Sequence, residues 1–182
     1  MAERSVQDRA AGRAADAVTG RVNALDRDGF VAAFGALYED SPWVAAAAYE
    51  RRPFESRDDL LAAMSAAVRE APRERQIALI RAHPDLAGRA AVAGELSEDS
   101  AREQAAAGLD RLTPAEHAEL TAANAAYRER FGFPFVICAR EHGKAEIIAA
   151  VRERLGHDPE REVATALHEI DRIAALRLQD LP

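Results

Sequence analysis

Cysteine is almost absent from this chain of 182 residues, in which Cys138 is the only one. A single cysteine cannot close a disulfide within the chain, which excludes a disulfide-stapled framework and suits a reducing compartment. Long apolar runs are missing as well, because none approaches the roughly 20 residues that a membrane-spanning helix needs. The first residues are charged and lack the apolar segment of a secretory signal peptide. We therefore expect a cytoplasmic protein with no membrane partner.

Positive charge is in the minority. The chain has 24 lysine and arginine residues and 31 aspartate and glutamate residues, which gives a formal net charge of −7. Proteins that bind nucleic acids normally present a basic surface to the phosphates, so we expect no nucleic-acid partner. The sequence also lacks the His-Glu-x-x-His and Cys-x-x-Cys spacings of metal sites and the glycine-rich loops of nucleotide sites. We therefore predict neither a metal site nor a nucleotide site.

The residues that are present favour a helical protein. Hydrophobic residues make up 48% of the chain and charged residues 30%, which is typical of a globular protein. Alanine is abundant and β-branched residues are few, and this balance favours helices. We predict an all-α, single-domain bundle of about seven to nine helices. Residues 1–24 are expected to form a helical or flexible arm, and residues 25–182 the helical domain.

Helix boundaries can be placed where capping residues and breakers coincide. The segment 113–116, Thr-Pro-Ala-Glu, has the form of a capping box with proline at the first helical position, and it predicts a helix to about Arg130. Gly132 and Pro134 break that helix. The aromatic run 131–137 could be a strand by periodicity, but it has no partner strand, so we predict no sheet.

His83 is expected at the end of a helix. Pro84 follows it, and the residue before a proline is pushed out of the α region. A loop containing two glycines is predicted over residues 85–95. An imidazole at this position can cap the last carbonyl groups of the helix, which is a structural role, or it can move protons in a reaction. The local sequence leaves both roles open.

Ser100 and Glu103 also have two interpretations. The spacing Ser-x-x-Glu is that of a capping box, which would start a helix at Ser100 and end it before Gly108. The same helix start would leave free N–H groups after Ser100, which can bind a carboxylate. Glu103 beside such a site could act as a base or orient a hydroxyl group. Similarly, the run 131–137 is either a buried plug or an irregular backbone that lines a pocket for a flat, urea-like ligand.

Five motifs, taken in order, resemble those of the OHCU decarboxylase family. They are His-Pro-Asp-Leu at 83–86, Ser-Ala-Arg-Glu-Gln at 100–104, Gly-Leu at 108–109, Phe-Gly-Phe-Pro-Phe-Val-Ile-Cys-Ala-Arg at 131–140 and Ala-Leu-Arg-Leu at 175–178. Each motif alone is weak, but the ordered set is specific and covers roughly Phe30 to Leu181. This family decarboxylates 2-oxo-4-hydroxy-4-carboxy-5-ureidoimidazoline (OHCU), an intermediate of urate breakdown, to (S)-allantoin.

The resemblance implies a set of site residues. His83 and Glu103 match the catalytic histidine and glutamate of the family. The positions that match ligand-contacting residues are Pro84, Ser100, Ala101, Arg102, Glu103, Gln104, Phe135, Val136, Ile137, Cys138, Ala139 and Arg177. The match at Arg177 leaves Arg172 and Arg140 open as alternatives for the active-site arginine. The resemblance further implies that the enzyme needs no cofactor and that a homodimer is possible.

Two other functions are compatible with the sequence. The first is a non-catalytic helical binding module, which the helical pattern and the capping-box interpretation of Ser100 favour. The second is a hydrolase of a related ureido acid that holds a metal ion with His83, Asp85 and Glu103, although the spacing of these residues argues against such a site.

Overall fold

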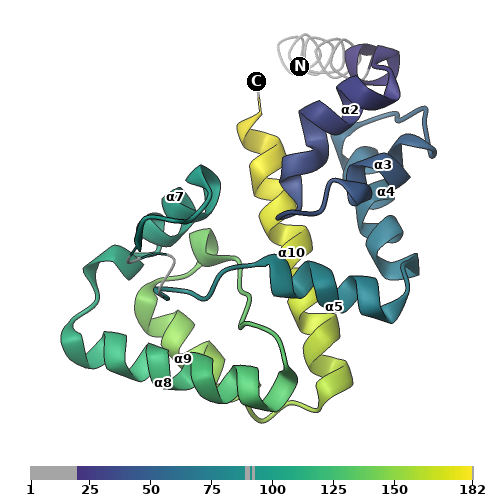
Figure 1. The fold of residues 1–182 in the computed structure, drawn as a ribbon. Helices are drawn as coiled ribbons and strands as arrows, with labels where there is room; N and C mark the ends of the chain where they lie inside the picture. The colour runs from purple at the N-terminus through teal and green to yellow at the C-terminus, as the bar shows by residue number, and fades with distance from the viewer. Residues whose placement is uncertain (1–19, 89–90, 92, 182) are drawn as a thin grey trace, which may run out of the picture. The chain divides into compact units, whose positions relative to one another are not determined.

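The computed structural model describes residues 20–88, 91 and 93–181. Most of the predicted arm, residues 1–19, lies outside the described residues, and the predicted domain boundary after residue 24 stays a prediction. The described residues form helices and contain no strand, which confirms the all-α class (Figure 1). Eight α-helices have both ends within the described residues, as the sequence predicted. None of these helices combines the length and the apolar character that crossing a membrane would require.

The chain divides into two compact units. The first takes the described residues up to Pro72 together with those from Leu178 onward. Its core forms around the Phe30 ring, whose centroid lies 4.8 Å from that of Phe34 and 5.9 Å from that of Phe54. In chain order its elements are α2 (Arg27–Phe34), the 3-10 turn η1 (Gly35–Leu37), α3 (Trp43–Tyr49) and α4 (Arg57–Glu70).

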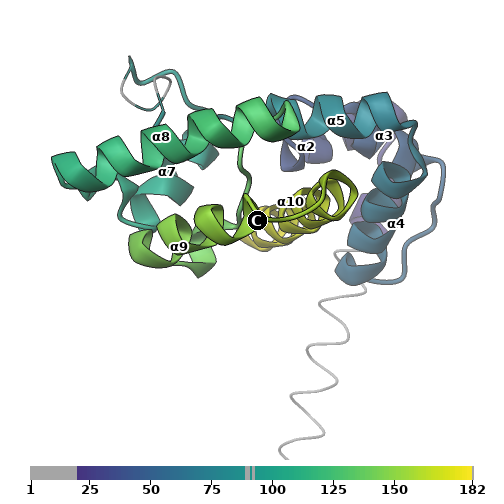
Figure 2. The same ribbon diagram turned by 90° about the horizontal axis from the view of Figure 1, so that it is seen from below.

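The second unit, Arg73–Arg177, contains every residue of the predicted site. Helices α8 and α9 lie side by side in it, and α7 packs against η3 (Figures 1 and 2). In chain order its elements are α5 (Arg73–Ala82), α7 (Glu98–Ala106), η2 (Leu109–Arg111), α8 (Pro114–Phe131), η3 (Ala139–Glu141), α9 (Lys144–Arg154) and α10 (Pro159–Asp180), the last of which belongs to this unit up to Arg177.

The boundaries of α8 follow the predicted chemistry. Thr113 accepts a hydrogen bond from the N–H of Glu116, and the Glu116 carboxylate accepts one from the N–H of Thr113, so the capping box is complete. Gly132 ends the helix with a φ of 76°, a left-handed conformation that glycine adopts without a steric penalty. The chain then continues as irregular backbone through residues 133–138, as predicted.

Helix α10 buries charged residues that apolar periodicity alone did not predict. Val163, Leu167, Ile170 and Ile173 are buried, as their spacing indicated. Four buried residues, three of them charged, recur at intervals of seven, four and four along the same helix; they are Glu162, Glu169, Ile173 and Arg177. Intervals of three, four or seven place residues on one face of a helix. The helix therefore presents one stripe of mixed charge and apolar surface to its own unit.

The predicted loop over residues 85–95 is only partly a loop. Residues 84–88 are non-helical, and Ala87 has a φ of 50°. Ala91 and Ala93, in contrast, are helical. Alanine has the highest helix propensity of all residues, and the two glycines that suggested a loop flank this alanine-rich stretch instead of interrupting it.

Candidate active site

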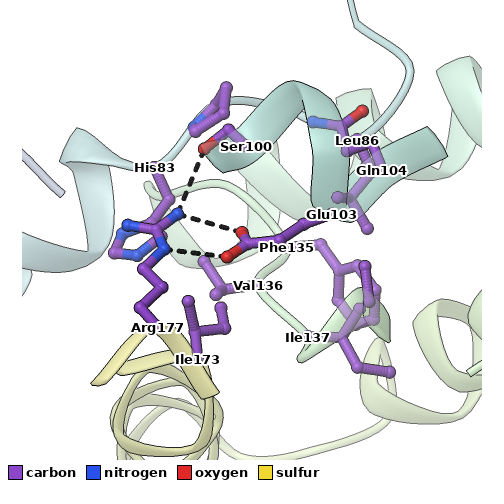
Figure 3. Close-up of a pocket in the computed structure, with 12 residues that line it drawn as sticks. His83, Leu86, Ser100, Glu103, Gln104, Phe135, Val136, Ile137, Ile173 and Arg177 are labelled. Atoms are coloured by element: carbon purple, nitrogen blue, oxygen red, sulfur yellow. Dashed lines mark hydrogen bonds and ion pairs between the residues drawn. The ribbon is translucent and has the colours of Figure 1, made fainter. Parts of the chain in front are cut away.

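One pocket in the second unit gathers the residues of the sequence motifs (Figure 3). It contains about 370 Å³ of space free of protein atoms, including the part that is open to solvent. Its lining comes from the end of α5, from α7, from the irregular segment before η3 and from α10; the residues are His83, Pro84, Leu86, Ser100, Glu103, Gln104, Phe135, Val136, Ile137, Ala139, Ile173 and Arg177. His83 and Glu103 thus converge on a single hollow, although they are separated in the chain.

The His83 ring both caps a helix and lines the pocket. Helix α5 ends at Ala82, and the His83 Nδ1 atom lies 3.0 Å from the carbonyl oxygen of Leu79 in the last turn. A carbonyl oxygen can only accept, so Nδ1 carries the hydrogen of this bond and the ring is fixed in one orientation. Nε2 is then the nitrogen that can gain or lose a proton. The two roles that the sequence left open for His83 are compatible.

Helix α7 begins one turn earlier than predicted, so the capping box at Ser100 and Glu103 is wrong. Its N-cap is Ser97, whose hydroxyl oxygen accepts a hydrogen bond from the N–H of Ser100 at 3.3 Å. The N–H of Ala101 donates to the Ser97 carbonyl oxygen at 2.9 Å, so the predicted free N–H groups after Ser100 are already engaged. The acidic Glu98 and Asp99 occupy the first turn, where the positive end of the helix dipole favours negative charge.

This register decides which side chains of α7 reach the pocket. Ser100, Glu103 and Gln104 stand three and four positions apart, so they share one face of the helix and all line the pocket. Ala101 and Arg102 are exposed on other faces of the helix, and Arg102 pairs with Asp99 at 2.5 Å. These two residues do not line the pocket, and a contact of theirs with a ligand stays a prediction.

A buried ion pair spans the pocket wall. The Glu103 carboxylate accepts two hydrogen bonds from Arg177, with Nε–Oε1 at 2.8 Å and Nη2–Oε2 at 2.9 Å (Figure 3). Arg177 Nη2 also donates to the Ser100 hydroxyl oxygen at 3.3 Å. The side chains of Arg177 and Glu103 are only 4% and 9% exposed. A bidentate pair of this kind fixes the orientation of both groups and compensates both charges away from water.

The structure places Arg177 in the pocket and the two alternative arginines elsewhere. Arg172 pairs with Glu169 and Glu141 and is partly exposed. Arg140 is exposed and does not line the pocket. Of the three arginines, only Arg177 lines the pocket, because it lies one helical turn after Ile173 and shares its face of α10.

The irregular segment of residues 135–139 forms another wall. The carbonyl oxygen of Val136 accepts a hydrogen bond from Arg154 Nη1 at 2.8 Å, and the N–H of Cys138 donates to Glu169 Oε2 at 2.8 Å. Within the described residues, the N–H groups of Val136 and Ile137 have no hydrogen-bond acceptor. The Cys138 side chain is buried outside the pocket, and burial raises the pKa of its thiol to about 11. The thiol is therefore unreactive, and a contact of Cys138 with a ligand stays a prediction.

Sequence reasoning missed two pocket residues and the role of a third. Leu86 and Ile173 supply apolar lining. Leu86 stands inside the His-Pro-Asp-Leu motif, and Ile173 stands one helical turn before Arg177, so both could have been found by extending those motifs. Gln104 was predicted to contact a ligand, but its Oε1 atom also accepts a hydrogen bond from the N–H of Ala87 at 2.9 Å. That bond fixes the amide and anchors the turn that follows His83.

Asp85 does not join His83 and Glu103 in a metal site. Its carboxylate accepts hydrogen bonds from Arg128 Nε at 2.9 and 3.0 Å. In the part of the chain that the structure describes, no three histidine, cysteine, aspartate or glutamate residues lie close enough together to hold a metal ion. The arrangement therefore disfavours a hydrolase that uses these three residues as metal ligands.

The chain was compared with known proteins. A family model described as OHCU decarboxylase matches residues 23–179. The 2-oxo-4-hydroxy-4-carboxy-5-ureidoimidazoline decarboxylase of Haloferax volcanii is 47% identical over 160 residues, a match that covers 88% of this chain and 93% of the relative. The protein of the same name from Mus musculus is 44% identical over 161 residues, covering 88% of this chain and 90% of the relative.

A solved structure gives the same result. The crystal structure of an (S)-allantoin synthase matches this chain with a TM-score of 0.71 and 29% identity. The match covers 88% of this chain and 52% of the synthase chain, so this protein spans about half the length of that structure. The family model, the relatives and the solved structure agree, and the chain belongs to the OHCU decarboxylase family.

Proposed function

We propose that this protein decarboxylates 2-oxo-4-hydroxy-4-carboxy-5-ureidoimidazoline to (S)-allantoin in urate breakdown. The observation that carries the proposal is the convergence of His83, Glu103 and Arg177 on one pocket, together with membership of a family whose relatives bear the name of this activity. Burial of polar groups costs free energy unless hydrogen bonds or ion pairs compensate it. Here, five buried polar residues gather in one small hollow; they are His83, Ser100, Glu103, Gln104 and Arg177.

The proposed substrate needs little chemistry from the protein. Loss of carbon dioxide leaves a carbanion, so the reaction requires an electron sink. The substrate provides its own, because a conjugated C=N bond adjoins the carbon that carries the carboxylate. The protein must then hold the carboxylate out of the plane of the ring, stabilise the developing charge and deliver a proton to one face.

The pocket supplies a group for each of these tasks. Arg177 provides a fixed positive charge beside Ser100, where a carboxylate or another polar substituent of the substrate would bind. The N–H groups of Val136 and Ile137, which have no acceptor among the described residues, fit the carbonyl oxygens of a ureido group or ring amide. His83, through Nε2, and Glu103 move the protons and orient the ring hydroxyl.

The proposal is tested with freshly made substrate. Urate oxidase and hydroxyisourate hydrolase generate OHCU in a cuvette, and circular dichroism follows the appearance of optically active allantoin. OHCU also decays spontaneously, but that reaction yields no excess of one enantiomer. We expect the purified protein to accelerate the appearance of the (S)-allantoin signal in proportion to its concentration.

The same assay separates the alternatives. A binding module without catalytic activity would leave the time course unchanged at every protein concentration, and this result would overturn the proposal. A metal-dependent hydrolase of a related ureido acid would lose activity after dialysis against a chelator, whereas the proposed reaction would continue at the same rate.

Location and assembly are further parts of the proposal. We infer a cytoplasmic protein, which the lone and buried Cys138 supports because its thiol forms no intrachain disulfide. The net charge of −7 supports the absence of a nucleic-acid partner. A homodimer is possible, and analytical ultracentrifugation of the purified chain would test it.

A further inference from the structure

A second group of buried charges lies outside the pocket. Glu162 is fully buried on α10 and accepts hydrogen bonds from Arg154 Nε at 2.9 Å, from Arg154 Nη2 at 2.5 Å and from the Tyr127 hydroxyl. His157 Nδ1 lies 2.6 Å from its other carboxylate oxygen. None of these four residues lines the pocket or has a part in the proposed reaction. We call them the Glu162 cluster.

Arg154 connects the Glu162 cluster to the pocket wall. Its Nη1 atom donates to the carbonyl oxygen of Val136 at 2.8 Å, and its guanidinium carbon lies 4.5 Å from the centre of the Phe135 ring. Both Val136 and Phe135 line the pocket. Glu162 therefore fixes the Arg154 guanidinium group through one set of hydrogen bonds, and the same guanidinium group binds the pocket wall at Val136.

Glu169 contacts the same wall two residues further along. Its Oε2 atom accepts a hydrogen bond from the N–H of Cys138 at 2.8 Å, and Arg172 pairs with its other oxygen at 3.1 Å. Arg154 and Glu169 therefore bind the backbone on either side of Ile137. Arg154 binds the carbonyl oxygen before it, and Glu169 binds the N–H group after it. The N–H group of Ile137 lies between these two anchors and the N–H group of Val136 lies directly before them, and neither has an acceptor among the described residues.

Buried ion pairs are weak evidence for stability, because desolvation offsets most of the attraction. An irregular backbone segment, in contrast, lacks helix or sheet hydrogen bonds, so other groups must bind its N–H and C=O groups to fix their orientation. We propose that Arg154 and Glu169 are positioning residues, which clamp the segment 136–138 so that its free N–H groups face the substrate. This inference rests on the proposed function.

The clamp is tested by removing one anchor at a time. Arg154→Met and Glu169→Met each release one side of Ile137, whereas Glu169→Gln keeps an oxygen that can accept from the N–H of Cys138. N–H groups that bind the substrate in both its ground state and its transition state contribute mainly to KM. We expect each methionine variant to lose about tenfold in kcat/KM, mostly through a higher KM, and Glu169→Gln to stay close to the wild type.

Tyr127→Phe is the matched control. It removes the hydrogen bond that the hydroxyl donates to Glu162 and the one that it accepts from Arg154 Nη2 at 3.4 Å, but it leaves the bond from Arg154 to Val136 and the ring contact with Phe135, whose centroid lies 5.3 Å away. The control should lower the melting temperature and leave KM and kcat unchanged. Equal kinetic losses in Tyr127→Phe and Arg154→Met would overturn the clamp, because they would reflect a general loss of stability.

Hydrogen exchange provides a readout that does not depend on turnover. In Arg154→Met the amide of Cys138, which Arg154 does not touch, should exchange faster, while amides in α8 keep their protection. Wild-type exchange at Cys138 in this variant would overturn the inference. If Arg154→Met does not fold, Glu169→Met and Glu169→Gln decide through the same measurements. A wild-type protein without decarboxylase activity would refute the proposed function, and exchange would still decide on the clamp.

Discussion

The polar residues of the candidate site both line the pocket and hold neighbouring groups, so their structural and catalytic roles have to be separated. His83 is an example, because Nδ1 binds the Leu79 carbonyl oxygen while the ring lines the pocket. A residue that caps a helix is expected to affect stability, whereas one that moves protons is expected to affect turnover. Variants that remove one role and keep the other can therefore assign both.

We predict that His83→Asn loses turnover without losing the helix cap. The asparagine amide nitrogen can take the place of Nδ1 and donate to Leu79, but it cannot accept or release a proton as Nε2 does. Turnover should fall by about a hundredfold to ten-thousandfold in both His83→Asn and His83→Ala, while His83→Ala also melts at a lower temperature. The measurements are the rate of (S)-allantoin formation and thermal unfolding. Normal turnover in His83→Asn would leave this residue with the capping role alone.

The Glu103–Arg177 pair leads to a different expectation at the same scale. Glu103→Gln removes a charge and leaves Arg177 buried beside a neutral amide, which destabilises proteins by about 3 kcal/mol or more. Turnover and stability should therefore fall together in this variant. The double variant Glu103→Gln, Arg177→Met removes both charges, so it should recover part of the stability and none of the activity. Denaturant unfolding of the wild type, of Glu103→Gln, of Arg177→Met and of the double variant measures the coupling.

Helices position these residues, and their register depends on capping. Helix α7 starts at Ser97 and not at Ser100, and this shift decides that Ser100, Glu103 and Gln104 share the face that lines the pocket. The site is thus sensitive to the end of this helix. Helix α8 has an equally well-formed N-terminus, but no residue of α8 lines the pocket.

We expect Ser97→Ala and Thr113→Ala to have similar effects on stability and different effects on activity. Each loses an N-cap hydrogen bond, worth about 1 kcal/mol of stability. Ser97→Ala frays the first turn of α7, which contains Ser100, so kcat/KM should fall. Thr113→Ala serves as the control and should retain the activity of the wild type. Matched melting temperatures with equal kinetics in both variants would show that the site tolerates fraying of α7.

At the scale of the whole molecule, acid pH is expected to weaken the fold through its carboxylates. Hydrogen bonds from Lys144 and from Thr113 lower the pKa of Glu116 from its usual 4.5 to about 2, and the N–H of Arg161 also lowers the pKa of Asp158. A carboxylate whose pKa is lower in the folded state stabilises the fold at pH values above its unfolded pKa. This contribution is lost as the pH falls through the folded pKa.

The melting temperature should therefore fall between about pH 4.5 and pH 2, where Glu116 gains a proton, and the lowered pKa of Asp158 acts in the same direction. Glu116→Gln cannot titrate at this position, so it should be less stable than the wild type at pH 7 and nearly equal to it near pH 2. Thermal unfolding of both proteins over this range checks the prediction. A constant difference at all pH values would show that the ion pair with Lys144 does not contribute.

The helical class, the complete capping box of α8, the end of α5 before Pro84 and the irregular backbone after Gly132 all follow from the amino-acid sequence alone. All of these depend on residues a few positions apart, whose steric and hydrogen-bonding preferences act locally. The sequence also identified the motifs of the pocket, through resemblance to a family. The prediction of Ser100 as the start of α7 was wrong, because Ser97 is also a serine followed by acidic residues and it caps the helix instead.

The entry of Arg177 into the pocket, its pairing with Glu103, and the contacts of Arg154 and Glu169 with the pocket wall depend on the packing of the helices. These contacts join residues up to 74 positions apart. A buried charge needs a partner of opposite charge, and the packing of the helices determines which residue that partner is. Periodicity within a single helix contains no information about a partner on another helix. Interactions between residues close in sequence thus set the helix boundaries, whereas the pairing of buried charges between distant residues sets the arrangement of the site.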